Sequence, residues 1–176
     1  MPPKSLLISS VLLSATLGAP SASQAAETQT CNDAIVATAP DSRYQDNGDG
    51  TITDLATGLI WKQCAEGLSG PGCTTGTSQT FTWHAALQHA EAAVFAGSSL
   101  WRLPNNKELA SLRERRCYTP AINTTLFPNT PSSGFWSSSP STYNSSYAWL
   151  VNFYYGYVST YLKNGQEYVR LVRGGQ

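Results

Sequence analysis

The chain has 176 residues, 41% of them hydrophobic, and its 11 basic and 11 acidic side chains give a formal net charge of +0. This balance does not support a nucleic-acid partner, because binding to phosphates depends on concentrated positive charge. The length fits a single folded domain with one core.

Residues 1–25 have the pattern of a secretory signal peptide. Lys4 gives the positive start, residues 6–17 form a short apolar stretch, and small residues stand at 23–25. The apolar stretch is too short to span a bilayer, so we expect no membrane insertion. The predicted product is exported, and is periplasmic, secreted or on the cell surface. Residues 26–41 are expected to be an N-terminal linker segment, and 42–176 the folded domain.

The four cysteines of an exported chain predict two disulfides. Cys64 and Cys73 flank a short Gly-rich loop, so we pair them, and Cys31 pairs with Cys117 by elimination. No cysteine spacing resembles a zinc knuckle, and neither histidine is near a cysteine. We therefore expect no metal and no cofactor.

A β-hairpin is predicted over 44–54, because Asn47-Gly48 and Asp49-Gly50 are turn dipeptides between strand-forming residues. Calcium binding is the alternative, since Asp46, Asn47, Asp49 and Asp54 carry oxygen ligands. The spacing does not match an EF-hand loop, which favours the turn. A second turn at Thr57-Gly58 leads into an apolar strand over 59–61.

The first predicted helix covers 82–96, with Thr82 as its N-cap. Leu87, Ala90 and Val94 recur at helical spacing, and Gly97 is the expected stop signal. His84 and His89 lie on this helix about 140° apart around its axis. We expect both histidines to be structural or exposed to solvent.

The second predicted helix starts at Asn105, where Glu108 three residues later makes a capping box, and continues to about Arg116. Leu109 and Leu112 mark its buried side. The basic residues of this helix are interpreted as a solvated face rather than an anion site. They are Lys107, Arg113, Arg115 and Arg116.

The remaining chain is predicted to form strands over 134–138, 147–153, 157–162 and 168–173. Helices followed by an antiparallel meander predict an α+β domain, with two helices packed on an antiparallel sheet. Seven of the nine tyrosines lie in this region among serines and asparagines. That composition is typical of binding surfaces, and it also fits an ordinary tyrosine-rich sheet.

Five ordered motifs resemble the Lcl C-terminal domain family of exported bacterial proteins. They lie at 46–51, 57–61, 101–104, 135–139 and 169–175, and together cover nearly the whole exported chain. The family is named after the terminal domain of a collagen-like adhesin that binds sulfated glycans, so the resemblance implies adhesion or ligand binding. No collagen-type repeat is present, and the adhesin's stalk does not carry over.

Trp101-Arg102-Leu103-Pro104 before a helix and the Arg-Leu-Val-Arg-Gly-Gly end are similar to the formylglycine-generating branch of the C-type lectin-like fold. The resemblance implies that fold. The enzyme of that branch needs a late cysteine pair, whereas no cysteine follows Cys117 here. The calcium-dependent sugar motifs Glu-Pro-Asn and Trp-Asn-Asp are missing as well. We therefore do not expect an enzyme.

The end of the chain also resembles the variable region of proteins that diversity-generating retroelements mutate at adenines. That resemblance implies an exposed patch with a constant backbone and variable side chains, and it gives the predicted ligand-binding residues. They are Tyr143, Asn144, Ser146, Tyr147, Asn152, Tyr154, Tyr155, Tyr157, Ser159, Tyr161 and Asn164. The expected partner is a cell-surface glycan or protein receptor. The alternatives are a self-associating structural envelope protein and, less favoured, an enzyme.

Overall fold

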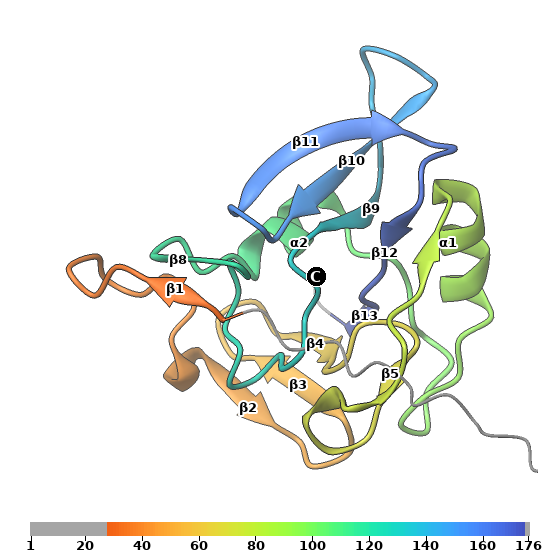
Figure 1. Ribbon diagram of the computed structural model, residues 1–176. Helices are drawn as coiled ribbons and strands as arrows, with labels where there is room; N and C mark the ends of the chain where they lie inside the picture. The colour runs from red at the N-terminus through yellow and green to blue at the C-terminus, as the bar shows by residue number, and fades with distance from the viewer. Residues whose placement is uncertain (1–27, 175–176) are drawn as a thin grey trace, which may run out of the picture.

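The computed structural model describes residues 28–174 (Figure 1). The predicted signal peptide, 1–25, lies outside the described residues. The described chain is α+β, as predicted, with more strand than helix. The helices are Trp83–Glu91 (α1) and Asn106–Ser111 (α2), with 3-10 turns at Asp41–Arg43 (η1) and Pro71–Cys73 (η2). The more specific C-type lectin-like fold stays a prediction.

The largest sheet has five strands in the order β11-β10-β9-β12-β7. Its strands are Thr80–Phe81 (β7), Gly134–Pro140 (β9), Tyr147–Asn152 (β10), Tyr157–Leu162 (β11) and Glu167–Tyr168 (β12). The pairs are antiparallel except β9 with β12, which is parallel. The expectation of a purely antiparallel sheet is therefore wrong at this pair. The chain leaves β11 and passes β10 and β9 before entering the sheet again, so no hairpin forces β12 to run antiparallel to β9.

The second sheet has four strands in the order β13-β4-β3-β2. They are Tyr44–Asp46 (β2), Thr51–Asp54 (β3), Leu59–Lys62 (β4) and Val172–Gly174 (β13). Two short pairs complete the strands, Thr30–Cys31 (β1) with Cys117–Tyr118 (β8), and Leu68–Ser69 (β5) with Thr75–Gly76 (β6).

The predicted hairpin over 44–54 is confirmed, with Gln45 opposite Thr53. Its acidic side chains are engaged within the protein. Asp46 accepts a hydrogen bond from Gly48 N, and Asp49 accepts one from Thr51 N. Asp54 accepts from Arg43 Nε at 2.9 Å and from Ala56 N at 3.0 Å.

The first helix is shorter than its predicted range of 82–96. Thr82 is the N-cap, as predicted, and its hydroxyl accepts from Ala85 N. The helix ends at Glu91 because Phe95 turns back, pairs with the backbone of Ser98 and accepts a hydrogen bond from Trp101 Nε1. Val94, which the spacing places on the apolar face, is consequently exposed.

The second helix has the predicted capping box, in which Asn105 Oδ1 accepts from Glu108 N and a Glu108 carboxylate oxygen accepts from Asn105 N. It ends at Ser111 instead of about Arg116. Glu114 N bonds to Ala121 O rather than to the helix, and the Glu114 carboxylate is drawn toward the N-terminal segment. These long-range contacts end the helix.

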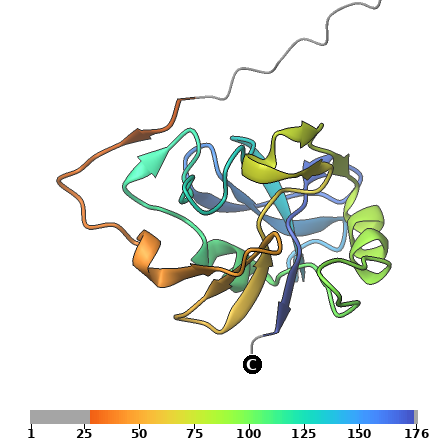
Figure 2. The same ribbon diagram turned by 90° about the horizontal axis from the view of Figure 1, so that it is seen from below.

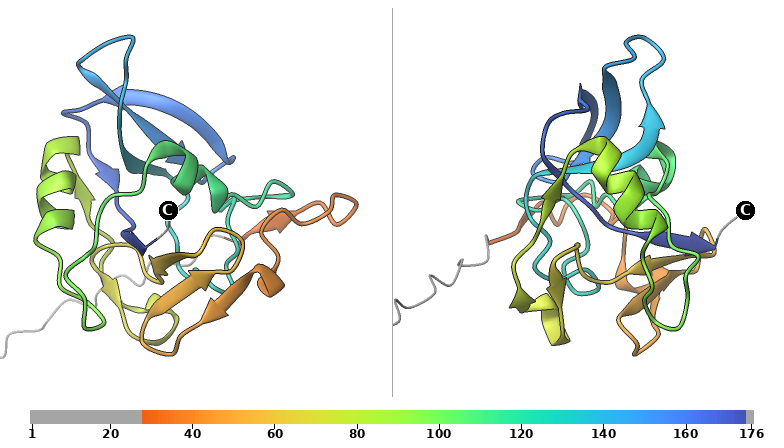
Figure 3. Two further views of the ribbon diagram at one scale, coloured as in Figure 1. Left: turned by 180° about the vertical axis from the view of Figure 1, so that it is seen from behind. Right: turned by 90° about the vertical axis from the view of Figure 1, so that its right-hand side faces the viewer.

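The two helices lie on opposite faces of the β9–β10 pair. In this pair Phe135 is opposite Val151 and Trp136 is opposite Leu150. Phe135 and Val151 pack with Leu109 of α2, whereas Trp136 and Leu150 pack with Ala86 and Ala90 of α1. Figure 3 shows α1 at the outer side of the sheet, away from α2.

The main core lies between the two large sheets and α2. The four-stranded sheet contributes Tyr44, Ile52 and Trp61, and α2 and the residue after it contribute Leu109 and Leu112. Burial of Leu109 and Leu112 confirms the predicted inner side of this helix. Packing of apolar side chains from three elements fixes where the five-stranded sheet sits.

The predicted strand over 168–173 is two short strands, β12 and β13, in different sheets. Between them, Arg170 is fully buried and donates to the carbonyl oxygens of Lys62 and Gln63 and to Thr130 Oγ1. The chain therefore crosses from one sheet to the other around this side chain. Burial lowers the pKa of Arg170, and its guanidinium lies over the Phe127 ring, 4.9 Å from the centroid.

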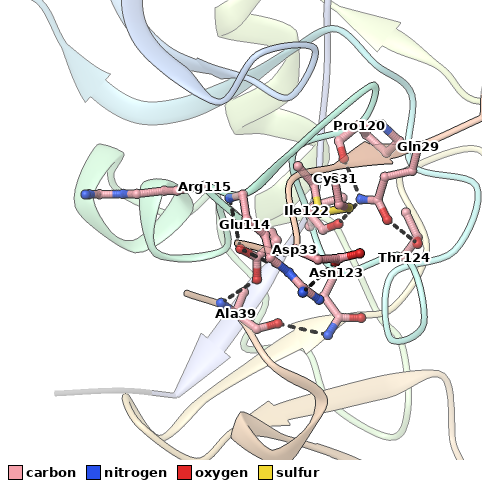
Figure 4. The surroundings of a disulfide bond; sticks show 12 residues. Gln29, Cys31, Asp33, Ala39, Glu114, Arg115, Pro120, Ile122, Asn123 and Thr124 are labelled. Atoms are coloured by element: carbon pink, nitrogen blue, oxygen red, sulfur yellow. Dashed lines mark hydrogen bonds and ion pairs between the residues drawn. A yellow bond between two sulfur atoms is a disulfide. The ribbon is translucent and has the colours of Figure 1, made fainter. Parts of the chain in front are cut away.

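Both predicted disulfides are present, Cys31 with Cys117 and Cys64 with Cys73. The first attaches residues 28–41, the described part of the predicted linker, to the domain. Gln29 Nε2 donates to Pro120 O and Ile122 O, and a Glu114 oxygen accepts from Ala39 N at 2.9 Å (Figure 4). Figure 2 shows the same segment passing β8 before it reaches η1.

Candidate ligand-binding surface

The β10–β11 hairpin carries most of the predicted site residues, and β11 is one of the two edge strands of its sheet (Figure 1). Residues paired across two strands point to the same face. One face receives the pairs Asn152 with Tyr157, Leu150 with Ser159, and Ala148 with Tyr161. The opposite face receives Val151 with Val158, Trp149 with Thr160, and Tyr147 with Leu162.

We call the first of these the Tyr157 face, defined by Asn152, Tyr157, Ser159 and Tyr161. Tyr157 is 48% exposed and Tyr161 is 46% exposed, whereas Leu150 on the same face is buried. The Tyr161 ring also lies 6.3 Å from the ring of Trp136, next to α1. The face is therefore open on the outer strand and covered toward the helix.

Three other predicted residues, Ser146, Tyr147 and Asn164, gather at the end of the hairpin next to the β9–β10 loop. Lys163 N donates to Ser146 O at 2.9 Å, which joins the two ends of the hairpin there. Ser146, Leu162, Lys163 and Asn164 line a shallow, open hollow. Tyr147 is opposite Leu162 and hence points away from the Tyr157 face.

The loop between β9 and β10 carries Tyr143 and Asn144 and projects from the body of the molecule (Figure 1). Tyr143 is 99% exposed. Asn144 shapes the loop, because its Oδ1 accepts from Ser146 N and its carbonyl accepts from Tyr147 N, both at 3.0 Å. Asn144 thus has a structural task besides any contact with a ligand.

The turn between β10 and β11 holds Tyr154 and Tyr155. Their ring centroids are 4.4 Å apart in an edge-to-face arrangement, and the Tyr155 ring lies 6.2 Å from that of Tyr118. We call Tyr118, Tyr154 and Tyr155 the aromatic cluster. These three side chains are 45%, 37% and 66% exposed. Three neighbouring aromatic rings are thus exposed to solvent.

The eleven predicted residues consequently do not form one patch. Asn152, Tyr157, Ser159 and Tyr161 share a face, Tyr154 and Tyr155 lie at the turn, and the other five lie at the opposite end or in the loop. A strand of six residues is roughly 17 to 20 Å long, so one small ligand cannot contact both ends. Their role in binding stays a prediction.

Two residues of this surface escape the sequence reasoning, Tyr118 and Glu167. Tyr118 follows Cys117, and only the fold brings it to Tyr155. Glu167 lies on β12 between Gly165 and Tyr168, in the stretch otherwise noted for its tyrosines. Glu167 of β12 lies beside Gly134 of β9, and this neighbourhood can be recognised only when the register between the two strands is known.

The Glu167 carboxylate lies over β9. A Cβ atom placed on Gly134 would overlap Glu167 Oε2 and come close to Leu150 Cδ2. Glycine at 134 thus leaves the room that the carboxylate fills. Burial raises the pKa of Glu167 above its usual value, and within residues 28–174 no hydrogen-bond donor or cation is paired with it.

The two histidines are not among the residues of the Tyr157 face or of the aromatic cluster. His84 is exposed, while His89 Nε2 lies 2.7 Å from Glu66 Oε2, and Lys62 Nζ lies 2.8 Å from Glu66 Oε1. This cluster joins α1 to the chain after β4. In the described part of the chain, no group of three or more His, Cys, Asp or Glu is placed to hold a metal ion.

Within residues 28–174, no helix has the length and apolar character that crossing a membrane requires. Two disulfides are typical of proteins that fold outside the cytoplasm.

A family model, the Lcl C-terminal domain, matches residues 50–173 and so includes both helices, the hairpin and Glu167. None of the curated proteins matches the chain. The matched range starts within the turn of the β2–β3 hairpin, so the segment held by Cys31 precedes it. The chain belongs to the Lcl C-terminal domain family.

Proposed function

We propose that this exported protein is a ligand-binding, adhesin-like domain that recognises a cell-surface glycan or protein receptor. The aromatic cluster is the observation that carries the proposal. Tyr118, Tyr154 and Tyr155 expose much ring surface, and the Tyr155 ring lies beside both of the others. Tyrosine is enriched among the residues that dominate binding energy, because it offers a large, rigid and amphipathic surface.

The backbone under the cluster is fixed, which supports binding without a large ordering cost. Thr119 N donates to Tyr154 O, and Ala121 N donates to Phe153 O, so the segment after Cys117 lies along the turn. Arg113 Nη1 donates to Gly156 O at 2.9 Å. The Cys31–Cys117 disulfide holds the residue next to Tyr118.

Binding without catalysis is part of this proposal. His89 Nε2 is engaged with the Glu66 carboxylate, a contact that joins α1 to the chain after β4. Replacing His84 and His89 by Gln is therefore expected to leave ligand binding unchanged. Loss of the protein's activity toward its ligand in this double variant would favour a histidine-dependent enzyme instead.

Diversification of the hairpin by a retroelement is a further part of the proposal. Its support is that Tyr157 and Tyr161 are exposed on a strand whose backbone is hydrogen-bonded to β10, and that Tyr143 and Tyr155 are exposed in the neighbouring loop and turn. The test is to sequence the coding region of 134–175 in many isolates. Changes confined to adenines at the eleven predicted positions are expected, and changes scattered evenly over the segment would contradict diversification.

The binding proposal is tested with an array of neutral, sialylated and sulfated oligosaccharides and with immobilised fibronectin and laminin. The wild type is expected to bind at least one probe, and the triple variant Tyr118→Ser, Tyr154→Ser, Tyr155→Ser to lose that binding. A matched control is Val94→Ser with Leu100→Ser, which removes apolar side chains that are 76% and 77% exposed elsewhere. Equal binding by the triple variant would contradict the proposal.

Self-association as a structural envelope protein is the second candidate, and the edge of β11 favours it. β11 is an edge strand of the sheet, and its residues Tyr157–Leu162 are uncharged and suited to strands. Such an edge can accept a strand of another chain. Oligomers that grow with concentration and disappear when Ser159 is replaced by Lys, with the fold kept, would support this candidate over ligand recognition.

A further inference from the structure

Glu167 and Asn152 stand side by side on the Tyr157 face. Gly134 is the direct partner of Asn152 in the β9–β10 register, and Glu167 Oε2 fills the place of a Gly134 Cβ. Cβ atoms of directly paired residues are about 4.5 to 5.5 Å apart. The carboxylate therefore lies over β9, on the same face as Asn152 and in the neighbouring strand position.

The amide of Asn152 has a fixed orientation. Its Oδ1 accepts a hydrogen bond from Tyr154 N at 2.8 Å, which places the oxygen toward the turn. The Nδ2 group is then left with two donors and no hydrogen-bond partner within residues 28–174. An unused pair of donors consequently lies next to a carboxylate that only accepts.

Tyr157 completes the row. It is directly opposite Asn152 in the β10–β11 register, and 48% of its surface is exposed. The order across three strands is thus carboxylate, amide and aromatic ring, over about 10 Å at the usual strand spacing. That length matches one or two sugar rings.

The charged side chains around Glu167 limit the class of ligand that this face can bind. Arg113 donates to Ala110 O and Gly156 O, and Lys163 Nζ lies 4.3 Å from the centroid of the Trp83 ring. Glu167 has no cationic partner among the described residues. A sulfate or carboxylate on the ligand would meet this uncompensated negative charge at close range.

We infer that Glu167, Asn152 and Tyr157 form a subsite for an uncharged saccharide with neighbouring hydroxyl groups. One hydroxyl donates to the Glu167 carboxylate, the next accepts from Asn152 Nδ2, and the sugar's C–H surface lies on the Tyr157 ring. Each hydroxyl both donates and accepts, so a donor beside an acceptor suits a vicinal diol. The inference rests on the proposed binding function and names its ligand class.

The test uses the purified chain and maltotriose, mannotriose and cellotriose as neutral probes, at up to millimolar concentration. Resonances of the Asn152 side-chain amide and of Tyr157 are followed by NMR during each titration. At least one neutral trisaccharide is expected to shift both. Glu167→Gln and Asn152→Asp are each expected to weaken that binding by at least about tenfold.

Asn152→Asp is informative because its oxygen still accepts from Tyr154 N while its donors are lost. Glu91→Gln, an exposed carboxylate on α1, is the matched control and should bind as the wild type does. Two further probes, a heparin-derived tetrasaccharide and a lysine tripeptide, represent anionic and cationic ligands.

Failure of the inference and of the proposed function are distinguishable. Binding of the heparin tetrasaccharide that depends on the aromatic cluster but not on Glu167 would overturn the inference and leave the proposed function intact. Binding of the lysine tripeptide that depends on Glu167 would overturn the saccharide class. If no neutral trisaccharide moves the two resonances, the inference is wrong.

Discussion

The ring centroids of Tyr118 and Tyr155 are 6.2 Å apart, so the segment held by the Cys31–Cys117 disulfide lies against the turn of the β10–β11 hairpin. The bond that attaches the N-terminal segment also supports one side of the aromatic cluster. Stability and ligand binding are therefore expected to respond together to changes at this place.

Removal of the two disulfides should have unequal effects. Cys31 and Cys117 are 86 positions apart, whereas Cys64 and Cys73 are 9 apart. Loop-closure entropy predicts losses of about 4 to 5 kcal/mol for Cys31→Ser with Cys117→Ser, and about 2 to 3 kcal/mol for Cys64→Ser with Cys73→Ser. Chemical denaturation of both double variants measures the free energies of unfolding. Equal losses would contradict this ranking.

Glu114 is expected to make attachment of the N-terminal segment sensitive to acid. Burial by itself raises the pKa of Glu114, but hydrogen bonds from the backbone N–H groups of Ala39, Arg116 and Thr38 outweigh it, and the net pKa is lowered. A lowered folded-state pKa gives stability that is present above the unfolded-state value and is lost as pH falls through the folded-state value.

Glu114→Gln should thus cost about 1 to 3 kcal/mol near neutral pH. The difference from the wild type should shrink below about pH 4. Denaturation at both pH values and hydrogen exchange at the amides of Thr38 and Ala39 measure the effect, with Glu91→Gln as the control. A difference that stays constant with pH would show that the charge of Glu114 is not responsible.

The contribution of Glu167 to stability should change with pH in the opposite direction to that of Glu114. Burial raises the pKa of its carboxyl, so the folded state binds the proton more tightly than the unfolded state. The charged side chain then lowers stability above its folded-state pKa, and this cost disappears at acid pH. Glu167→Gln is expected to stabilise the protein at neutral pH and to have little effect below about pH 4. Destabilisation at neutral pH would mean that the carboxylate has a favourable partner.

Gly134→Ala should be destabilising because of the Glu167 side chain and not because of the backbone. The added Cβ would overlap Glu167 Oε2. We expect a loss of at most about 1 kcal/mol, because the overlapping atoms are the far end of the flexible Glu167 side chain, which can move to another rotamer. Combining Gly134→Ala with Glu167→Ala should recover most of that loss. A double-mutant cycle by thermal denaturation measures the coupling, and strictly additive effects would contradict the contact.

Local signals in the sequence were sufficient for several elements. The hairpin over 44–54 follows from its turn dipeptides, and the start of α2 follows from the capping box of Asn105 and Glu108. Both depend on residues close in sequence. The ends of the helices could not be predicted, because Glu114 bonds to the N-terminal segment and Phe95 packs against Trp101.

The change of sheet between β12 and β13 also depends on distant residues. The sequence pattern predicts Arg170 as a polar residue within a strand, whereas its hydrogen bonds to Lys62, Gln63 and Thr130 hold it in the core. The candidate site shows the same limit. Alternation predicts which hairpin residues share a face, whereas the approach of Glu167 to Gly134 requires the parallel pairing of β12 with β9.

The most direct measurement is the dissociation constant of the tightest probe on the array for three proteins. They are the wild type, the triple variant Tyr118→Ser, Tyr154→Ser, Tyr155→Ser, and the control Val94→Ser with Leu100→Ser. We predict that the triple variant binds at least about tenfold more weakly and that the control matches the wild type. Equal dissociation constants for all three proteins would contradict a binding role of the aromatic cluster.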